Sequence, residues 1–255
     1  MFLQIRTIAY YTILEGLRNR ILWLVGLILL CGIGLTVFLG ELAITEQREM
    51  QVALLAVFLR FSLAFLVATF VVTSMVREFN DKSIDLLLAL PISRSVYLLG
   101  KLAGFTFLAV LPSLACGVLT LLLSSWQQSA LWSITLGFEL WLVAGFSLLC
   151  AFTFNQTMTA LSTSMAFYLL GRSISVIHLI GHGTNGSQSL LQRFIAFFID
   201  IISTVMPHLD QFARTEWLVY RNGTLDMILP LFLQASIYLT LLSAASLFDL
   251  HRRNV

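Results

Sequence analysis

The chain has very little charge for its length. Only 11% of its 255 residues are Asp, Glu, Lys or Arg, whereas 58% are hydrophobic, and the mean hydropathy is +0.91. Soluble domains carry about 25% charged residues, so this composition excludes a soluble protein and indicates an integral membrane protein. No polar stretch is long enough for a soluble domain, which predicts one membrane domain over residues 1–255 and no nucleic-acid partner.

Cysteine and histidine are scarce as well. Cys31, Cys116 and Cys150 all fall in apolar runs without C-x-x-C spacing, so we expect packing residues rather than metal or redox sites. His178 and His182 are four residues apart, on the side of the membrane expected for His208. Imidazoles at this spacing can share a metal. Gly181 is expected to end the helix before His182, however, and Asp210 is the only nearby carboxylate, so we expect interfacial histidines and no metal site.

Six apolar segments are long enough to cross a membrane as helices, which requires about 20 residues. They cover residues 21–40, 52–76, 102–124, 131–153, 159–180 and 225–248. Residues 1–20 place apolar side chains at every fourth position and charged residues elsewhere, which predicts an amphipathic helix in the membrane interface. The expected fold is therefore an all-α membrane protein with six transmembrane helices and an N-terminal interfacial helix. Gly100 and Gly104 fit close helix packing at the start of the third span.

Lys and Arg predict the orientation, because they concentrate on the cytoplasmic side. With the N-terminus inside, nine of these residues lie on the cytoplasmic side and four on the outer side. We therefore expect both termini in the cytoplasm and the chain in a bacterial inner membrane. Trp126, Trp132 and Trp217 fall near the outer boundary and Trp23 near the inner one, as in an aromatic belt.

Residues 181–224, in front of the last span, do not fit a single membrane crossing. Residues 189–206 are apolar enough to compete as a seventh span, although Arg193 and Asp200 interrupt them. A seventh span would also place the arginines at the end of the chain outside, against the charge rule. We expect short helices that dip into the outer leaflet, with a seventh span as the alternative.

The stretch between the second and third spans is the most distinctive part of the sequence. Residues 77–96 form a charged island around a short Leu-rich helix predicted over 84–90, which Pro91 ends. Seven residues bury too little surface to hold to a bilayer unaided, so docking to another protein is favoured over an amphipathic turn on lipid. The apolar face of this helix consists of Leu86, Leu87 and Leu90. Its polar surroundings include Asp81, Lys82, Asp85 and Arg94.

Residues 78–101 (E-F-N-D-K-S-I-D-L-L-L-A-L-P-I-S-R-S-V-Y-L-L-G-K) resemble the loop between the second and third spans of ABC-2 type transporter permeases. The family pattern is similar to E-x-x-x-G/R-T-L-D-x-L-L-x-x-P-I-S-R-x-x-x-x-x-G-K. Lys82 and Ser83 depart from its common Gly-Thr. The matching residues are Glu78, Asp85, Leu87, Leu88, Pro91, Ile92, Ser93, Arg94, Gly100 and Lys101. Residues 206–212 resemble the P-N-L-D-x-F segment of the copper-enzyme-maturation subgroup, and 248–253 resemble the family's aromatic-then-basic terminus.

The resemblance implies that residues 84–90 are a coupling helix, which sits in a groove of a separate ATPase subunit. The residues it assigns to ATPase docking are Glu78, Asp81, Asp85, Leu86, Leu87, Leu90, Pro91 and Arg94. The chain is not expected to be an enzyme, because Leu102 follows Gly100-Lys101 where a P-loop needs Ser or Thr, and the first Gly of that motif, five residues before Gly100, is absent. No cofactor is expected in this chain, and ATP and Mg²⁺ would bind in the partner.

The implied assembly contains two ATPase copies and a second permease copy, as a homodimer in the lipid bilayer. It would export a substrate or transmit ATP-driven conformational change to a periplasmic partner.

Three charged residues, Arg60, Glu139 and Arg172, fall inside predicted spans. Each costs about 2.5–3.5 kcal/mol on insertion scales, so each should face protein or water and have a partner. All lie about eight residues from the outer ends of their spans, or ~12 Å, so one layer could hold an Arg–Glu–Arg network. The network either fixes helix packing, or one arginine lines an outer cavity and meets an anionic headgroup or gates the exit. The resemblance adds that spans two and five line the translocation pathway.

Two other classes of function remain open on the sequence. A secondary transporter or channel could use the Arg60, Glu139 and Arg172 layer, although arginine cannot release a proton in proteins. An intramembrane lipid-modifying enzyme would need an acid–base cluster, and Glu139 has no second carboxylate or His in its own segment. Neither alternative explains why the chain has the charged island of residues 77–96.

Overall fold

The computed structural model describes residues 2–42, 47–81, 93–154, 156–182 and 190–252. Within these ranges every regular element is a helix and no strand is present. Six of the described helices are long and apolar enough to cross a membrane, which confirms the predicted all-helical class and the expected number of helices of spanning length. By length and composition these helices indicate an integral membrane protein.

The long helices follow the predicted spans and extend several of them. They are α2 (Ile21–Leu42), α3 (Gln47–Asn80), α5 (Arg94–Leu121), α6 (Trp126–Thr153), α7 (Thr157–His182) and α10 (Ile228–Arg252). The shorter elements are α1 (Phe2–Arg18), α8 (Leu190–Val205), η1 (Leu209–Gln211), α9 (Thr215–Tyr220) and η2 (Leu225–Met227). The extension is large at α3, whose 34 residues continue beyond the apolar run at both ends.

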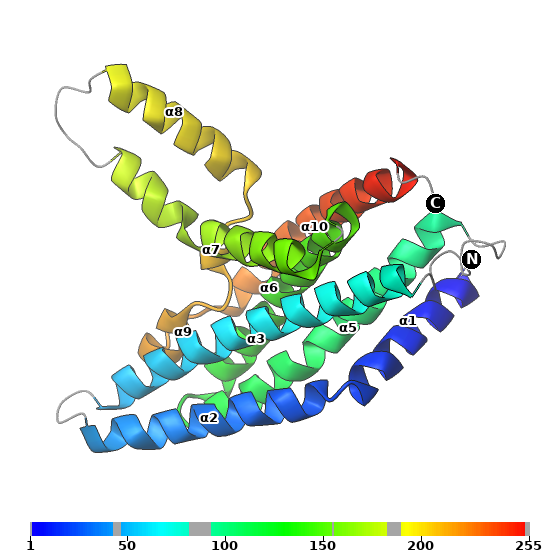
Figure 1. Ribbon diagram of the computed structural model, residues 1–255. Coiled ribbons are helices and arrows are strands. Elements are labelled where there is room, and N and C mark those ends of the chain that lie inside the picture. Colours follow the sequence, from blue (N-terminus) through cyan, green and yellow to red (C-terminus); the bar gives the residue numbers. More distant parts are fainter. Residues whose placement is uncertain (1, 43–46, 82–92, 155, 183–189, 253–255) are drawn as a thin grey trace.

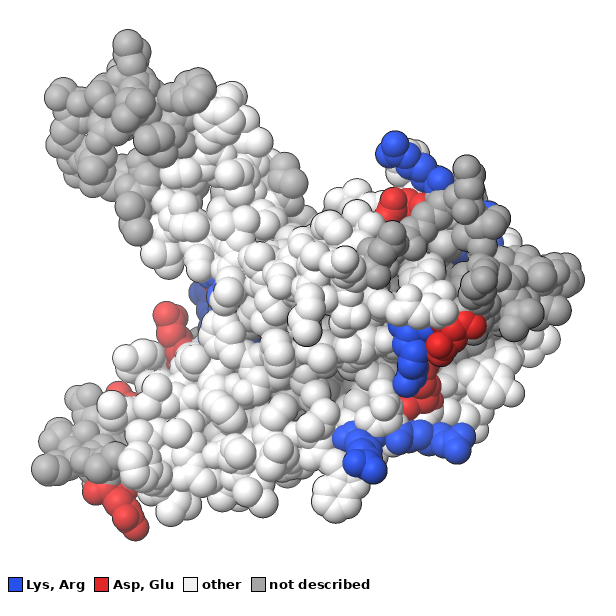
Figure 2. Space-filling model, in the orientation of Figure 1, with Lys and Arg blue, Asp and Glu red and all other residues white. Residues whose placement is uncertain are grey.

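The bundle is built around α6, which packs against α3, α5, α7 and α10. α6 is the most deeply buried of the spans, whereas few residues of α2 and α10 are buried. Both chain termini lie at the same end of the bundle (Figure 1). We call this the terminal end, and the opposite end, where α2 meets α3, the distal end. Figure 2 shows Lys, Arg, Asp and Glu gathered mainly over the terminal end.

α1 lies against the first half of α5, where two glycines allow a close approach. A Cβ on Gly100 would stand 2.7 Å from the Cβ of Ile8, and one on Gly104 would stand 2.6 Å from the Cβ of Thr12. Real Cβ atoms do not approach so closely, so this packing requires glycine, which has no side chain, at both positions. α1 is thus held to the bundle by one face, and its place in the membrane interface stays a prediction. The exposed large apolar side chains of α1 are Phe2, Leu3, Tyr10, Tyr11 and Leu17.

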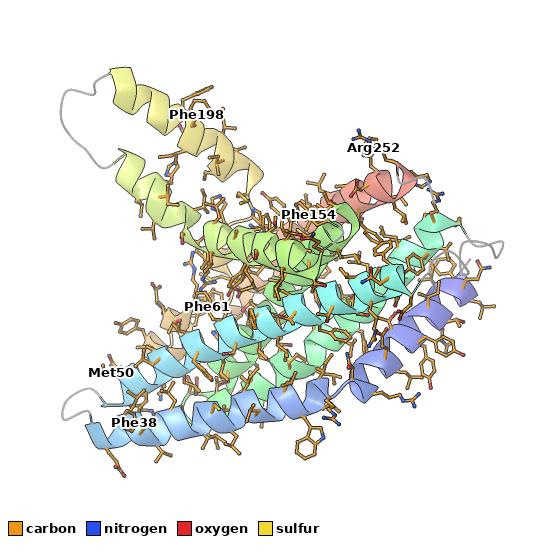
Figure 3. The ribbon with its side chains drawn as sticks, viewed as in Figure 1. Phe38, Met50, Phe61, Phe154, Phe198 and Arg252 are labelled. Atoms are coloured by element: carbon orange, nitrogen blue, oxygen red, sulfur yellow. The ribbon has the colours of Figure 1, made fainter. Side chains whose placement is uncertain are left out.

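The first half of residues 181–224 differs from the expectation. α7 continues to His182, so Gly181 does not end it. α8 is a single helix of 16 residues rather than several short ones. At 1.5 Å per residue it is ~24 Å long, shorter than a hydrocarbon core of about 30 Å. It packs against α7, and the second half of α7 projects from the bundle together with α8, which carries Phe198 (Figures 1 and 3).

The second half of this segment turns back into the bundle. Leu209 and Phe212 are fully buried, and Trp217 and Leu218 are at most 3% exposed. These apolar side chains therefore complete the protein's own core at the distal end instead of facing lipid. The expected dip of this region into the outer leaflet stays a prediction. Irregular backbone at membrane depth is tolerated where protein covers it.

The four tryptophans expected in the aromatic belt differ in their exposure. Trp23 and Trp126 are 80% and 70% exposed, as an aromatic belt requires. Trp132 is fully buried and Trp217 nearly so, and their expected place in the belt is therefore wrong. Both pack in the core cluster that also contains Leu209, Phe212 and Ala213. We call residues 206–218, which turn back into the bundle, the folded-back segment.

Candidate functional site

The three charged residues of the spans come from adjacent helices, and the structure brings them together. Arg60 on α3 is 5% exposed, and Glu139 on α6 is fully buried. Arg172 on α7 places Nη1 3.5 Å from Glu139 Oε1. The Tyr168 hydroxyl donates a hydrogen bond of 2.9 Å to the same oxygen. Among the described residues no ion pair joins Arg60 to Glu139, so the layer is an Arg172–Glu139 pair with Arg60 beside it.

Both arginines donate to main-chain carbonyls of the folded-back segment. Arg172 Nη1 donates to the carbonyl oxygens of Leu209 and Phe212, the latter at 3.0 Å. Arg60 Nη1 donates to the carbonyl of Ala213 at 3.1 Å, and Trp132 Nε1 donates to the same oxygen at 3.0 Å. We call Arg60, Glu139, Arg172 and Trp132, together with the folded-back segment, the distal cluster.

The backbone of Ala213 is the strained point of the distal cluster. Its φ is 42°, in the left-handed region, where an L-residue costs roughly 1–2 kcal/mol. The Ala213 carbonyl accepts two hydrogen bonds, and its N–H donates to Thr135 Oγ1 at 3.3 Å. These bonds hold the conformation in place, so the arginines and Trp132 act as anchors for the segment. No residue pattern signals this role directly, because every residue has a main-chain carbonyl.

A second cluster lies at the terminal end, where residues 82–92 connect α3 to α5. Lys101 on α5 is 6% exposed and forms ion pairs with Glu78 on α3 and with Glu15 on α1, the latter at 3.7 Å. The Tyr97 hydroxyl donates to Glu78 Oε2 at 2.6 Å. One buried ammonium thus joins three helices.

Glu15 binds two further residues of α3. Arg77 forms an ion pair with Glu15 Oε1, and the Ser74 hydroxyl donates to the same oxygen at 2.9 Å. We call Glu15, Ser74, Arg77, Glu78, Tyr97 and Lys101 the terminal cluster. Glu78 and Lys101 are the first and last residues of the stretch that resembles the permease loop, and the ion pair between them closes that stretch at its base.

Arg94, which the resemblance assigned to ATPase docking, makes contacts within this chain. Its Nη1 donates to the carbonyls of Leu250 at 2.9 Å and His251 at 3.4 Å, in the last turn of α10. A cation there satisfies carbonyls that lack helical partners and complements the helix dipole. Asp81 is exposed just after α3. The helix expected over 84–90 lies outside the described residues, and so do Asp85, Leu86, Leu87, Leu90 and Pro91.

The histidines are dispersed. His178 Nε2 lies 3.2 Å from Asp200 Oδ1 and joins α7 to α8. His208 Nδ1 lies 4.0 Å from Asp210 Oδ1 on its own segment. The side chain of His182 lies outside the described set. In the described part of the chain no group of three or more His, Cys, Asp or Glu could hold a metal ion.

Comparison with known proteins adds no assignment. No protein-family model matches the chain, and no curated protein matches it. The functional inference therefore rests on the residues themselves and on their geometry.

Proposed function

We propose that the chain is the permease subunit of an ATP-driven ABC-2 type transporter, and that it docks a separate ATPase through residues 84–90. The observation that carries the proposal is the buried ion pair of Glu78 and Lys101. It joins the two helices from which the charged island emerges, at the first and last positions of the resembling stretch.

Coupling to a soluble motor requires a lever that does not bend at its base. The Lys101 side chain is 8% exposed and the Glu78 side chain 16% exposed, so solvent screens their attraction little. Glu15 connects α1 to the same Lys101, and Arg94 at the start of α5 binds the end of α10. A displacement of residues 84–90 by an ATPase would therefore move α1, α3, α5 and α10 together.

The proposed orientation follows from the same end of the molecule. The end of α3 and the start of α5, which flank the charged island in the sequence, lie at the terminal end with both termini (Figure 1), and this end carries most of the visible charge (Figure 2). We assign this end to the cytoplasm of a bacterial inner membrane. The proposed assembly contains two permease copies and two ATPases, which bind ATP and Mg²⁺. It exports a substrate or transmits the conformational change to a periplasmic partner.

The distal cluster has a structural role in this proposal. Arg60 and Arg172 donate to main-chain carbonyls of residues 209–213, and Arg60 is enclosed. A secondary transporter would need a group that changes its proton or ion occupancy, and arginine keeps its proton. The geometry therefore favours the packing interpretation of this layer over a transport path through it.

The test is co-purification of the chain with candidate ABC ATPase subunits from the same organism, together with the ATPase activity of the complex. Leu87→Asp places a charge where we expect an apolar face, so the ATPase should dissociate or lose its coupling. Ser83→Asp is the matched control, because it adds the same charge to the same island at a residue that is already polar.

The permease itself should remain folded in both variants, with unchanged helical circular dichroism and melting temperature. The proposal is wrong if the wild-type chain binds no ATPase and Leu87→Asp changes nothing. Equal loss of binding in both variants would instead contradict the specific docking role of the leucine face.

A further inference from the structure

A pocket of about 390 Å³ opens at the distal end, between the start of α3, the turn after α5 and the end of α9. Its apolar lining consists of Val52, Leu123, Leu218 and Val219. Its charged lining consists of Arg48, Glu49 and Arg221. Val52 and Leu218 are buried, whereas the three charged residues are exposed. The pocket therefore has an apolar floor and a charged rim.

The charged rim is held in place but has unused bonding capacity. Arg48 donates from Nε and Nη2 to the Leu123 carbonyl at 3.1 and 3.0 Å, which leaves Nη1 for a ligand. Arg221 is fixed through its backbone, with φ of 55° and its N–H bonded to the Trp217 carbonyl at 3.1 Å. Within the described residues, the Arg221 guanidinium and the Glu49 carboxylate have no hydrogen bond or ion pair. Two cations and one anion thus surround the opening.

Two exposed aromatic residues locate this rim at the membrane surface. Trp126 is 70% exposed and begins α6 shortly after Leu123, and Tyr220 is 66% exposed and precedes Arg221. Trp and Tyr concentrate where lipid headgroups meet water. The apolar floor then lies on the side of the acyl chains, and the charged rim lies at the depth of the headgroups.

We propose that this pocket binds a zwitterionic phospholipid headgroup, with its phosphate at Arg48 and Arg221 and its ammonium at Glu49. Guanidinium groups bind phosphate oxygens by charge-assisted hydrogen bonds. A headgroup without an ammonium would leave Glu49 facing an anion, which disfavours phosphatidylglycerol. A free phosphate would leave the apolar floor without contact. The proposal is independent of the ATPase and of which side of the membrane the distal end faces.

The test is native mass spectrometry of the detergent-purified chain with dioctanoyl phosphatidylethanolamine or dioctanoyl phosphatidylglycerol. The wild type should retain more phosphatidylethanolamine. Glu49→Gln should remove this preference, and Arg221→Gln should weaken retention of both lipids about three- to fivefold, as for exposed ion pairs. Arg48 is left unchanged, because its bonds to Leu123 also hold the turn.

Asp226→Asn and Arg214→Gln are matched controls at the same end, outside the pocket lining, and should retain the wild-type preference. Unchanged melting temperatures would establish that each variant is folded. If Glu49→Gln and Arg221→Gln bind both lipids as the wild type does, the pocket is not the site. If inorganic phosphate with ethanolamine displaces the lipid at equal concentration, the ligand is a pair of free ions and the lipid proposal is wrong.

Discussion

In the terminal cluster, charged side chains bind one another, whereas in the distal cluster they mainly bind main chain. Lys101 has two carboxylate partners, and each of these carboxylates has a further donor. Arg60 and Arg172 donate to carbonyls of one folded-back segment, and Glu139 has a single charged partner at 3.5 Å. The terminal cluster therefore distributes its charge over several contacts, while the distal cluster depends on individual donors.

The two clusters stabilise different parts of the molecule. Side-chain pairs join whole helices, so the terminal cluster makes α1, α3 and α5 move as one unit. Donors to main chain fix one irregular segment, so the distal cluster closes the end of the bundle. Two atoms of the distal cluster, Glu139 Oε2 and Arg60 Nε, have no hydrogen-bond partner among the described residues. We expect the distal cluster to be the more sensitive of the two to single substitutions.

Arg172→Met should have the largest effect. It removes the charged partner of a fully buried Glu139 and a donor to two carbonyls. Breaking a buried ion pair costs about 3–5 kcal/mol in the free energy of unfolding. Detergent-based denaturation followed by circular dichroism measures this loss. Adding Glu139→Gln should recover part of it, because the uncompensated charge disappears. Additive losses in the double variant would contradict the pairing of these residues.

Lys101→Met should destabilise the chain less, by about 2 kcal/mol in the same measurement, although Lys101 is similarly buried. Glu78 would keep Tyr97, and Glu15 would keep Arg77 and Ser74. Their side chains are 16% and 23% exposed, so water can also reach them. If the chain is the proposed permease, this variant should still bind the ATPase but stimulate it less. A loss as large as that of Arg172→Met would remove the contrast between the clusters.

Gly104→Ala tests whether the terminal cluster depends on the packing of α1. The new Cβ would meet the Cβ of Thr12 at 2.6 Å and the Ala9 carbonyl oxygen at 3.1 Å, and backbone cannot move aside easily. Overpacking of this kind costs about 1–3 kcal/mol, and we expect about 1.5 kcal/mol because α1 is at the edge of the bundle. Gly34→Ala is the control, since its Cβ would meet nothing within 4 Å. It should be neutral or slightly stabilising.

The six spans could be predicted because an apolar run of about 20 residues is typical of a membrane-spanning helix and rare in soluble proteins. The charged residues inside these runs were also conspicuous, and the structure places Arg172 beside Glu139. The pairing of Glu78 with Lys101 was not foreseen, although the motif contains both residues. Side chains 23 positions apart meet only if the register of two helices brings them together, and composition does not determine that register.

The fold of residues 206–218 could not be predicted for a different reason. Leu209, Phe212 and Trp217 are apolar, and apolar side chains suit a lipid surface and a protein core equally. The positions of Arg60 and Arg172 distinguish the two, because their donors satisfy backbone carbonyls that lipid would leave unpaired. The same ambiguity is the reason why Trp132 was expected in an aromatic belt.

Arg77→Gln should have the smallest effect and separates exposure from charge within the terminal cluster. Its side chain is 54% exposed, although it binds the same Glu15 carboxylate as Lys101 does. Exposed ion pairs contribute about 0.2–1 kcal/mol, and Glu15 keeps the Ser74 hydroxyl and Lys101. We expect a loss of about 0.5 kcal/mol that shrinks as salt is added, because screening acts on exposed charges. A salt-independent loss equal to that of Lys101→Met would mean that the cluster works as one rigid network, in which burial does not rank its members.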